Sequence, residues 1–302
     1  MQIATLSKVT FNTSLGLNGI QRCNVLPGLE VGRYRGDGQL FPTRAWIHQI
    51  TPAIEFETLD VATALALGTY AFAYQGLALS AAFNCYLTQK TQDGGLAATG
   101  DKVAMANGLI LPIRLSVRHN QPAALTCRVI GRSADGTTAP MSVTADQNVP
   151  AGEQITAGHT VGKLSLNGSA YTMVEAMDLD FNIEHELLGG DGQVYPTRLH
   201  ILGASPKFTF ELADADMLAA VTLLGTKQAA TDSLFWLRKF DPNGTRVADG
   251  LAEHIKFSLA DGIWYPEQVE NQQGGHASVR LVCEPVWNGT DAIIVASAAA
   301  IT

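Results

Sequence analysis

A nine-residue segment occurs twice in this chain, 154 positions apart, and this repeat limits the possible folds more than any other feature. Residues 36–44 read Gly-Asp-Gly-Gln-Leu-Phe-Pro-Thr-Arg, and residues 190–198 read Gly-Asp-Gly-Gln-Val-Tyr-Pro-Thr-Arg. Other matches keep the same offset, among them Pro52 and Pro206, Phe56 and Phe210, Glu57 and Glu211, and the segments 107–112 and 261–266. Near the start, residues 17–19 match residues 166–168 only with a shift of about five positions. We therefore predict two tandem copies of one fold, at residues 1–155 and 156–302.

Local signals within each copy predict strands and one helix. Asp-Gly and Asn-Gly dipeptides, which favour hairpin turns, separate runs in which apolar and polar residues alternate. These runs cover residues 43–50, 53–58, 109–117, 124–130, 198–202, 207–212 and 278–283. Asp60 and Asp214 stand where an N-cap would begin a helix. The predicted fold class is mainly β with one helix per repeat, in two tandem β-sandwich or half-barrel domains.

The repeated segment is interpreted as a turn followed by a strand. Its repeat-defining residues are Gly36, Asp37, Gly38, Pro42 and Arg44 in the first copy and Gly190, Asp191, Gly192, Pro196 and Arg198 in the second. The glycines lack the Gly-Lys-Ser/Thr continuation of a phosphate-binding loop, so a hairpin turn is favoured. The prolines fit the start or edge of a strand, where a missing N–H costs little. The arginines suggest a recurrent ion pair, within each copy or between neighbouring units, or else a strand-edge arginine in water.

Charge and motif content argue against catalysis and against gripping nucleic acid. The formal net charge is −8, so the chain carries no basic footprint. The seven histidines are scattered, and no zinc-binding or nucleophile motif appears. We predict no catalytic, cofactor-binding or metal-binding residues. The four widely spaced cysteines predict reduced thiols in a cytoplasmic product, and the apolar stretch at 61–83 predicts a buried helical region and no membrane span.

The duplicated pattern resembles one known family. The Gly-Asp-Gly turn, then Pro52-x-Ile54-x-Phe56 or Pro206-x-Phe208-x-Phe210, then a helix, resembles the tail tube (major tail) proteins of long-tailed bacteriophages, in the siphovirus-like type with a duplicated tube domain. The resemblance implies trimeric, pseudo-hexameric rings that stack around a lumen lined by a continuous β-barrel. It further implies a structural role in the virion tail, assembled in the bacterial host cytoplasm, with double-stranded DNA passing through the lumen without specific binding.

The resemblance also implies partners and contact segments. Partners would be further copies of this chain, the tape measure protein, and the tail terminator and tip proteins, with no membrane involved. We expect long loops at residues 12–36, 89–106, 167–190 and 241–256 to reach the next ring. The acidic balance of the chain agrees with a repulsive lumen. The first half, with eleven Lys/Arg against ten Asp/Glu in residues 1–155, departs from a uniformly acidic one.

Two other structural classes remain open. A tail-tip or baseplate ring protein, or a capsid decoration protein, could use the same duplicated fold. A non-catalytic binding module, for example for carbohydrate, would need solvent-facing aromatic residues. Trp46 and Trp264 lie in apolar runs, which predicts that both belong to the core.

Overall fold

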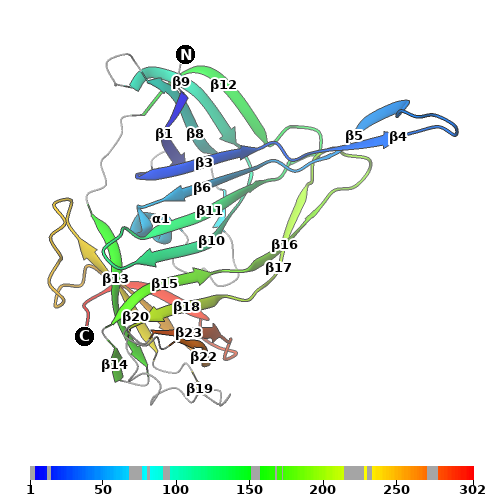
Figure 1. Ribbon diagram of the computed structural model, residues 1–302. Helices are drawn as coiled ribbons and strands as arrows, with labels where there is room; N and C mark the ends of the chain where they lie inside the picture. Colours follow the sequence, from blue (N-terminus) through cyan, green and yellow to red (C-terminus); the bar gives the residue numbers. More distant parts are fainter. Residues whose placement is uncertain are drawn as a thin grey trace.

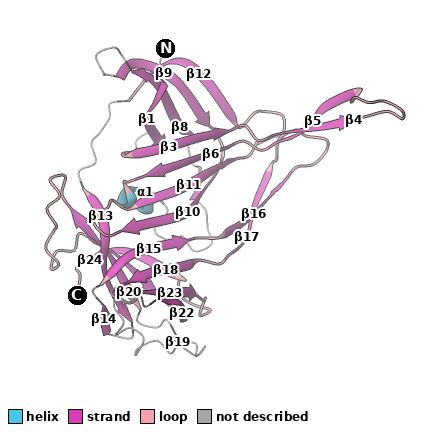
Figure 2. Cartoon of the chain, in the orientation of Figure 1, coloured by secondary structure: helices cyan, strands magenta, loops and turns pink. Residues whose placement is uncertain are grey.

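The computed structural model describes most of the chain and is built mainly from antiparallel strands (Figures 1 and 2). The described residues are 4–11, 15–67, 77–79, 82–90, 96–150, 157–166, 169–171, 173–213, 228–229, 233–270 and 278–302. The predicted β-rich class is confirmed, and all seven predicted strand runs fall on observed strands. None of the described sheets closes into a barrel within one chain.

A ten-stranded antiparallel sheet runs through the whole molecule. In spatial order its strands are β19 (Gln228–Ala229), β22 (Gly262–Glu270), β23 (Ser278–Pro285), β18 (Lys207–Leu212), β15 (Val174–Asp180), β10 (Gly108–Arg118), β11 (Ala124–Gly131), β6 (Ala53–Thr58) and β3 (Ile20–Leu26), with β7 (Leu77–Ala78) paired to β10. The strands of the first half thus occupy one side of this sheet and those of the second half the other.

Two five-stranded sheets pack on one face of the ten-stranded sheet. The first has the order β12 (Met141–Asn148), β9 (Leu96–Met105), β8 (Phe83–Lys90), β1 (Ala4–Phe11) and β2 (Leu15–Leu17). The second has the order β14 (Ser169–Tyr171), β13 (Gly158–Leu166), β20 (Leu234–Phe240), β21 (His254–Leu259) and β24 (Ile294–Ala299). Each five-stranded sheet and the neighbouring part of the large sheet form a sandwich with a shared apolar core.

The strand order of the first half recurs in the second at an offset of 154 residues. Matching pairs begin at Ala4 and Gly158, Leu15 and Ser169, Ile20 and Val174, Ala53 and Lys207, Gly108 and Gly262, and Ala124 and Ser278. The strands β2 and β14 keep this common offset, so the shifted sequence match between residues 17–19 and 166–168 does not join structurally equivalent residues. The boundary at residue 155, between β12 and β13, stays a prediction that this correspondence supports.

Alternation along the strands fills the core. Inward-facing residues such as Phe56, Leu125 and Phe208 are buried, while their strand neighbours point to the open face of the large sheet. The short helix α1 (Val61–Leu67) adds Val61 and Leu65 to this core. Asp60 Oδ1 accepts the backbone N–H of Thr63 at 3.4 Å, as an N-cap does. Asp214, the other expected N-cap, lies outside the described residues.

Two long β-hairpins extend from the large sheet. The first consists of β4 (Leu29–Tyr34) and β5 (Arg44–Ile50), and the second of β16 (Ile183–Leu188) and β17 (Arg198–Ala204). Figure 1 shows the first hairpin projecting away from the body, whereas the second bends back toward the base of the first. Trp46 lies on the first hairpin and is 51% exposed, so its predicted place in the core is wrong; Trp264 is buried as predicted.

Most of the segments expected to be long loops are strands. Residues 12–36 contain β2, β3 and β4, residues 89–106 contain β9, and residues 167–190 contain β14, β15 and β16. Residues 241–256 are irregular up to the start of β21. The hairpins, not these loops, are the projecting parts of the described chain.

Acid should destabilise the second sandwich through His159. This buried histidine lies on β13 opposite Lys239, and burial together with that charge lowers its pKa from 6.5 to about 4, despite a hydrogen bond with the backbone of Glu253. Below pH 6.5 the unfolded chain therefore binds a proton that the folded chain excludes until about pH 4. We expect the free energy of unfolding to fall by about 3 kcal/mol across this window. Denaturant unfolding of His159→Gln should show a flatter pH slope, and an unchanged slope would contradict the prediction.

Candidate assembly interface

One antiparallel joint between β10 and β15 connects the two halves of the ten-stranded sheet. Its register sets Arg114 opposite Asp180, Leu115 opposite Leu179, Ser116 opposite Asp178, Val117 opposite Met177 and Arg118 opposite Ala176. Leu115 and Leu179 are fully buried on the core side. The joint is thus a continuous part of the sheet, with one apolar face and one charged face.

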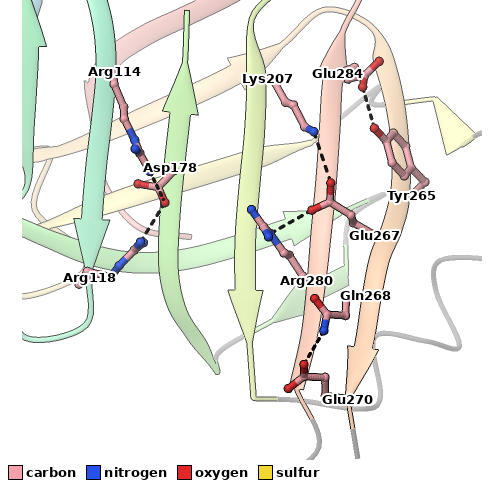
Figure 3. Close-up of polar contacts among 10 residues, drawn as sticks. All are labelled: Arg114, Arg118, Asp178, Lys207, Tyr265, Glu267, Gln268, Glu270, Arg280 and Glu284. Carbon is pink, nitrogen blue, oxygen red and sulfur yellow. Dashed lines mark hydrogen bonds and ion pairs between the residues drawn. The ribbon is translucent and has the colours of Figure 1, made fainter.

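Ion pairs cross this joint on its charged face (Figure 3). Oδ2 of Asp178 lies 3.1 Å from Nη2 of Arg114 and 3.0 Å from Nη2 of Arg118. Burial of Asp178 opposes its ionisation. The hydrogen bond from Ser116 and the hydrogen bond and charge of Arg118, with Arg114, outweigh burial and hold the pKa of this carboxyl below its ordinary 3.8.

Removing the charge of Asp178 should weaken the joint modestly. Because both arginines are partly exposed, we expect Asp178→Asn to lower the free energy of unfolding by about 1 kcal/mol at neutral pH. The stabilisation is present above pH 3.8 and is lost as pH falls through the lowered pKa, so wild type and variant should converge in acid. Denaturant unfolding at neutral and at acidic pH would measure the loss of stability and its disappearance in acid. The control Asp249→Asn, which breaks an exposed pair with Arg238, should change little; an equal loss in both variants would contradict a special role for Asp178.

The two ends of the ten-stranded sheet carry open edges. In the described part of the chain, β3 pairs with β6 alone. The strand β22 pairs with β23, and on its other side with β19 only at Ile263 and Trp264. Among the described residues, residues 266–270 of β22 therefore have no partner strand on their outer side, and neither does β3. Such edges are ready templates for pairing with another strand.

These open edges are the repeat equivalents of the two strands joined inside the chain. The strand β3 pairs with β6 as β15 pairs with β18, residue for residue at an offset of 154. Even the register irregularities correspond, between Ile20 and Arg22 in one ladder and between Val174 and Ala176 in the other. The ladder of β22 with β23 matches that of β10 with β11 in the same way. The β22 edge is therefore shaped like the β10 edge, and the β3 edge like the β15 edge.

The open face of the ten-stranded sheet is densely charged, and many of its charges are paired. Register and contacts put on this face the basic residues Arg22, Arg114, Arg118, Arg128, Lys207 and Arg280 and the acidic residues Glu55, Glu57, Glu175, Asp178, Asp180, Glu211, Glu267, Glu270 and Glu284. Among the described residues, six of the eight ion pairs lie here. Glu267, for example, forms ion pairs with Arg280 at 3.0 Å and with Lys207 at 3.6 Å (Figure 3). The face is mildly acidic and largely compensated.

The repeated Gly-Asp-Gly residues form the turns of the two hairpins. A backbone hydrogen bond closes each turn, over residues 36–39 at 3.1 Å and residues 190–193 at 2.9 Å. Gly38 and Gly192 have positive φ values of 74° and 70°, which favour glycine. Asp191 also has a positive φ, of 54°, so the two turns differ in type despite their nearly identical sequences.

The repeated prolines and arginines lie just after these turns. The strands β5 and β17 begin at Arg44 and Arg198, two residues after Pro42 and Pro196. Both arginines are exposed and form no ion pair with a described residue, so the expected pair within each copy is not found. The expected pair between units stays a prediction. Pro196 is buried whereas Pro42 is exposed, and this separates two otherwise matching loops.

The described residues offer little to a metal or cofactor. No group of three or more His, Cys, Asp or Glu side chains among them could hold a metal ion. A solvent-open hollow of about 520 Å³ lies between the hairpins, lined by Trp46, Leu187 and Pro196 among others. The titratable residues in that lining are His48 and Asp191.

Two comparisons with known proteins found no match: no protein-family model matches the chain, and no curated protein matches it. Within the described residues, no helix is long and apolar enough to cross a membrane. The features that remain are the internal joint, the two open edges and the two hairpins.

Proposed function

We propose that this protein is a tail tube (major tail) protein of a long-tailed bacteriophage, whose chains form rings that stack into a conduit for double-stranded DNA. The observation that carries the proposal is the head-to-tail β10–β15 joint, whose equivalent edges stay open at both ends of the same sheet. A head-to-tail contact repeats in one direction and gives a ring when its rotation closes. Three chains would give a ring with six copies of the repeat.

The internal joint supplies the register of the contact between chains. Each strand of the β10–β15 joint is replaced by its repeat equivalent, β10 by β22 at +154 residues and β15 by β3 at −154 residues. The register then pairs Gln268 with Leu26, Val269 with Val25 and Glu270 with Asn24 of the next chain. Val25 and Val269 correspond to Leu179 and Leu115, so both would become buried. Ring closure also removes the exposed edges, which an isolated chain leaves available for uncontrolled pairing.

Equivalent polar positions carry different side chains in the internal β10–β15 joint and in the proposed β22–β3 joint between chains. Asn24 stands where the internal joint has Asp178, and Gln268 stands where it has Arg114. Amide hydrogen bonds would therefore replace the central ion pairs between chains. Such a joint resists changes in ionic strength better than an ion pair does.

We infer that the open charged face lines the lumen and that the five-stranded sheets lie outside. When the ten-stranded sheets close into a ring, the convex outer side offers more space than the concave inner side, so the five-stranded sheets would fit on the outside. Paired charges on the lining would let DNA slide, because binding needs unpaired basic residues that displace its counterions. Stacked rings would meet the tape measure, terminator and tip proteins in the virion tail.

The test combines microscopy with cross-linking. Electron microscopy of purified protein should show rings or hollow striated tubes, and long tubes distinguish a tube protein from a tail-tip protein that forms one ring. Val25→Cys with Val269→Cys should form disulfides between chains under mild oxidation, up to a cross-linked trimer.

Two matched controls guard the cross-linking result. Each variant with only one added cysteine should stay uncross-linked, and Val25→Cys with Glu270→Cys should react poorly, because its side chains point to opposite faces. A chain that stays monomeric at high concentration, even with tail components present, would contradict the proposal.

A further inference from the structure

The second hairpin docks on the first half of the same chain through the loop that follows its turn. Four hydrogen bonds hold residues 193–196 there. Ile50 donates its N–H to Val194 O at 2.9 Å, Ser133 donates its N–H to Pro196 O at 2.8 Å, the side chain of Gln193 donates to Asp135 O at 3.1 Å, and Tyr195 donates its N–H to Gly136 O at 3.4 Å. The receiving surface, residues 133–138, is named here the first cradle.

The first cradle is a turn closed by side-chain hydrogen bonds. Oδ1 of Asp135 accepts the backbone N–H groups of Thr137 and Thr138 at 2.9 and 2.7 Å. Gly136 has a φ of 77°, and a Cβ there would clash with the side chain of Gln193. The loop of the second hairpin therefore fits closely against a glycine.

The second half contains an equivalent turn at residues 287–291, named here the second cradle. Oδ1 of Asn288 accepts the backbone N–H groups of Thr290 and Asp291, both at 2.9 Å, as Asp135 does in the first cradle. Gly289 has a positive φ of 90°, and nothing lies within 4 Å of where its Cβ would stand. The second cradle is thus formed, and no described residue fills the space beside Gly289.

The first hairpin carries a loop that matches the docked one but makes no equivalent hydrogen bonds with the described residues. Residues 39–42 correspond to residues 193–196, including an identical glutamine and proline. Leu40 and Phe41 are 83% and 78% exposed, whereas their counterparts Val194 and Tyr195 are partly buried. Beside the second cradle, Trp287 is 59% exposed. Exposed aromatic residues on both surfaces are the kind that anchor protein contacts.

We propose that the loop at residues 39–42 docks in the second cradle of the neighbouring copy of this chain. This inference rests on the proposed ring, and it adds a second contact to the same neighbour, since β3 and the first hairpin belong to one half. By the internal pattern, Gln39 donates to Asn288 O, Phe41 donates its N–H to Gly289 O, and Ala204 donates its N–H to Leu40 O. Phe41 and Trp287 then cover each other.

Trp287 itself can report the docking. Trp236 and Trp264 are buried, so a Trp46→Phe background leaves Trp287 as the exposed tryptophan. On assembly, its emission should shift to shorter wavelength and its quenching by acrylamide should fall. Phe41→Ala in this background should restore quenching and raise the concentration for half-maximal assembly about tenfold. Val143→Ala, a control at an exposed position outside both surfaces, should change neither value.

The cross-link between Val25→Cys and Val269→Cys separates the possible failures. Cross-linked rings in which Trp287 stays as accessible as in the monomer, with Phe41→Ala harmless, would overturn the hairpin contact and leave the tube proposal standing. Failure to form any cross-linked ring would overturn both.

Discussion

Replacing Val269 by lysine is expected to abolish assembly while the single chain keeps its fold. Val269 is 41% exposed at the open edge of β22, so the monomer can hold a lysine there in water. In the proposed ring it takes the place of Leu115, which is fully buried opposite Leu179. Burying an unpaired ammonium costs about 3 kcal/mol or more, which weakens association at least about a hundredfold.

Sedimentation or size-exclusion chromatography over a concentration series would measure this loss, with circular dichroism to check the fold. Val295→Lys is the matched control, since Val295 is 42% exposed on β24 and takes no part in the joint. Normal assembly of Val269→Lys would contradict the predicted register. Unfolding of the variant monomer would show that the β22 edge is part of the core.

Replacing Phe208 by alanine is expected to cause the largest loss of stability. Phe208 is fully buried in the second sandwich, and its ring centroid lies 4.7 Å from that of Phe235 and 6.5 Å from that of Phe257. Truncation removes apolar contact and leaves a cavity that the surrounding rings cannot fill. Such changes cost about 3–5 kcal/mol.

Chemical denaturation would report this as a lower midpoint with an unchanged slope. Leu251→Ala, at a half-exposed loop position, serves as the control and should stay within about 0.5 kcal/mol of wild type. A loss below about 1 kcal/mol in Phe208→Ala would mean that the aromatic cluster is not the centre of this core.

The sequence predicted the strands of the large sheet and the hairpins, because these alternate in polarity between clear turn signals. It predicted sandwich or half-barrel domains but assigned none of the strands of the two five-stranded sheets. The strand β20 reads as a continuous apolar run, which periodicity alone cannot assign.

The candidate interface was harder to predict than the fold. Strands β3 and β15 share an apolar register, Ile20 with Val174, Cys23 with Met177 and Val25 with Leu179, which could have been found at the common offset. The ion pairs of Asp178 depend on which strand of one half meets which strand of the other. Local sequence carries no signal for that choice. Trp46 was misassigned because a hairpin that leaves the body looks, residue by residue, like a core strand.

The charged face described above is unevenly divided between the two halves. Strands of the first half contribute Arg22, Arg114, Arg118 and Arg128 against Glu55 and Glu57, while seven of the nine acidic residues come from the second half. In a three-chain ring, basic and acidic sectors would alternate around the circumference. Fields from alternating sectors cancel with distance from the wall, unlike the field of a uniform lining. A polyanion centred on the axis would therefore move through a nearly constant electrostatic potential. Only a polyanion displaced toward the wall would be attracted by the basic sectors and repelled by the acidic ones.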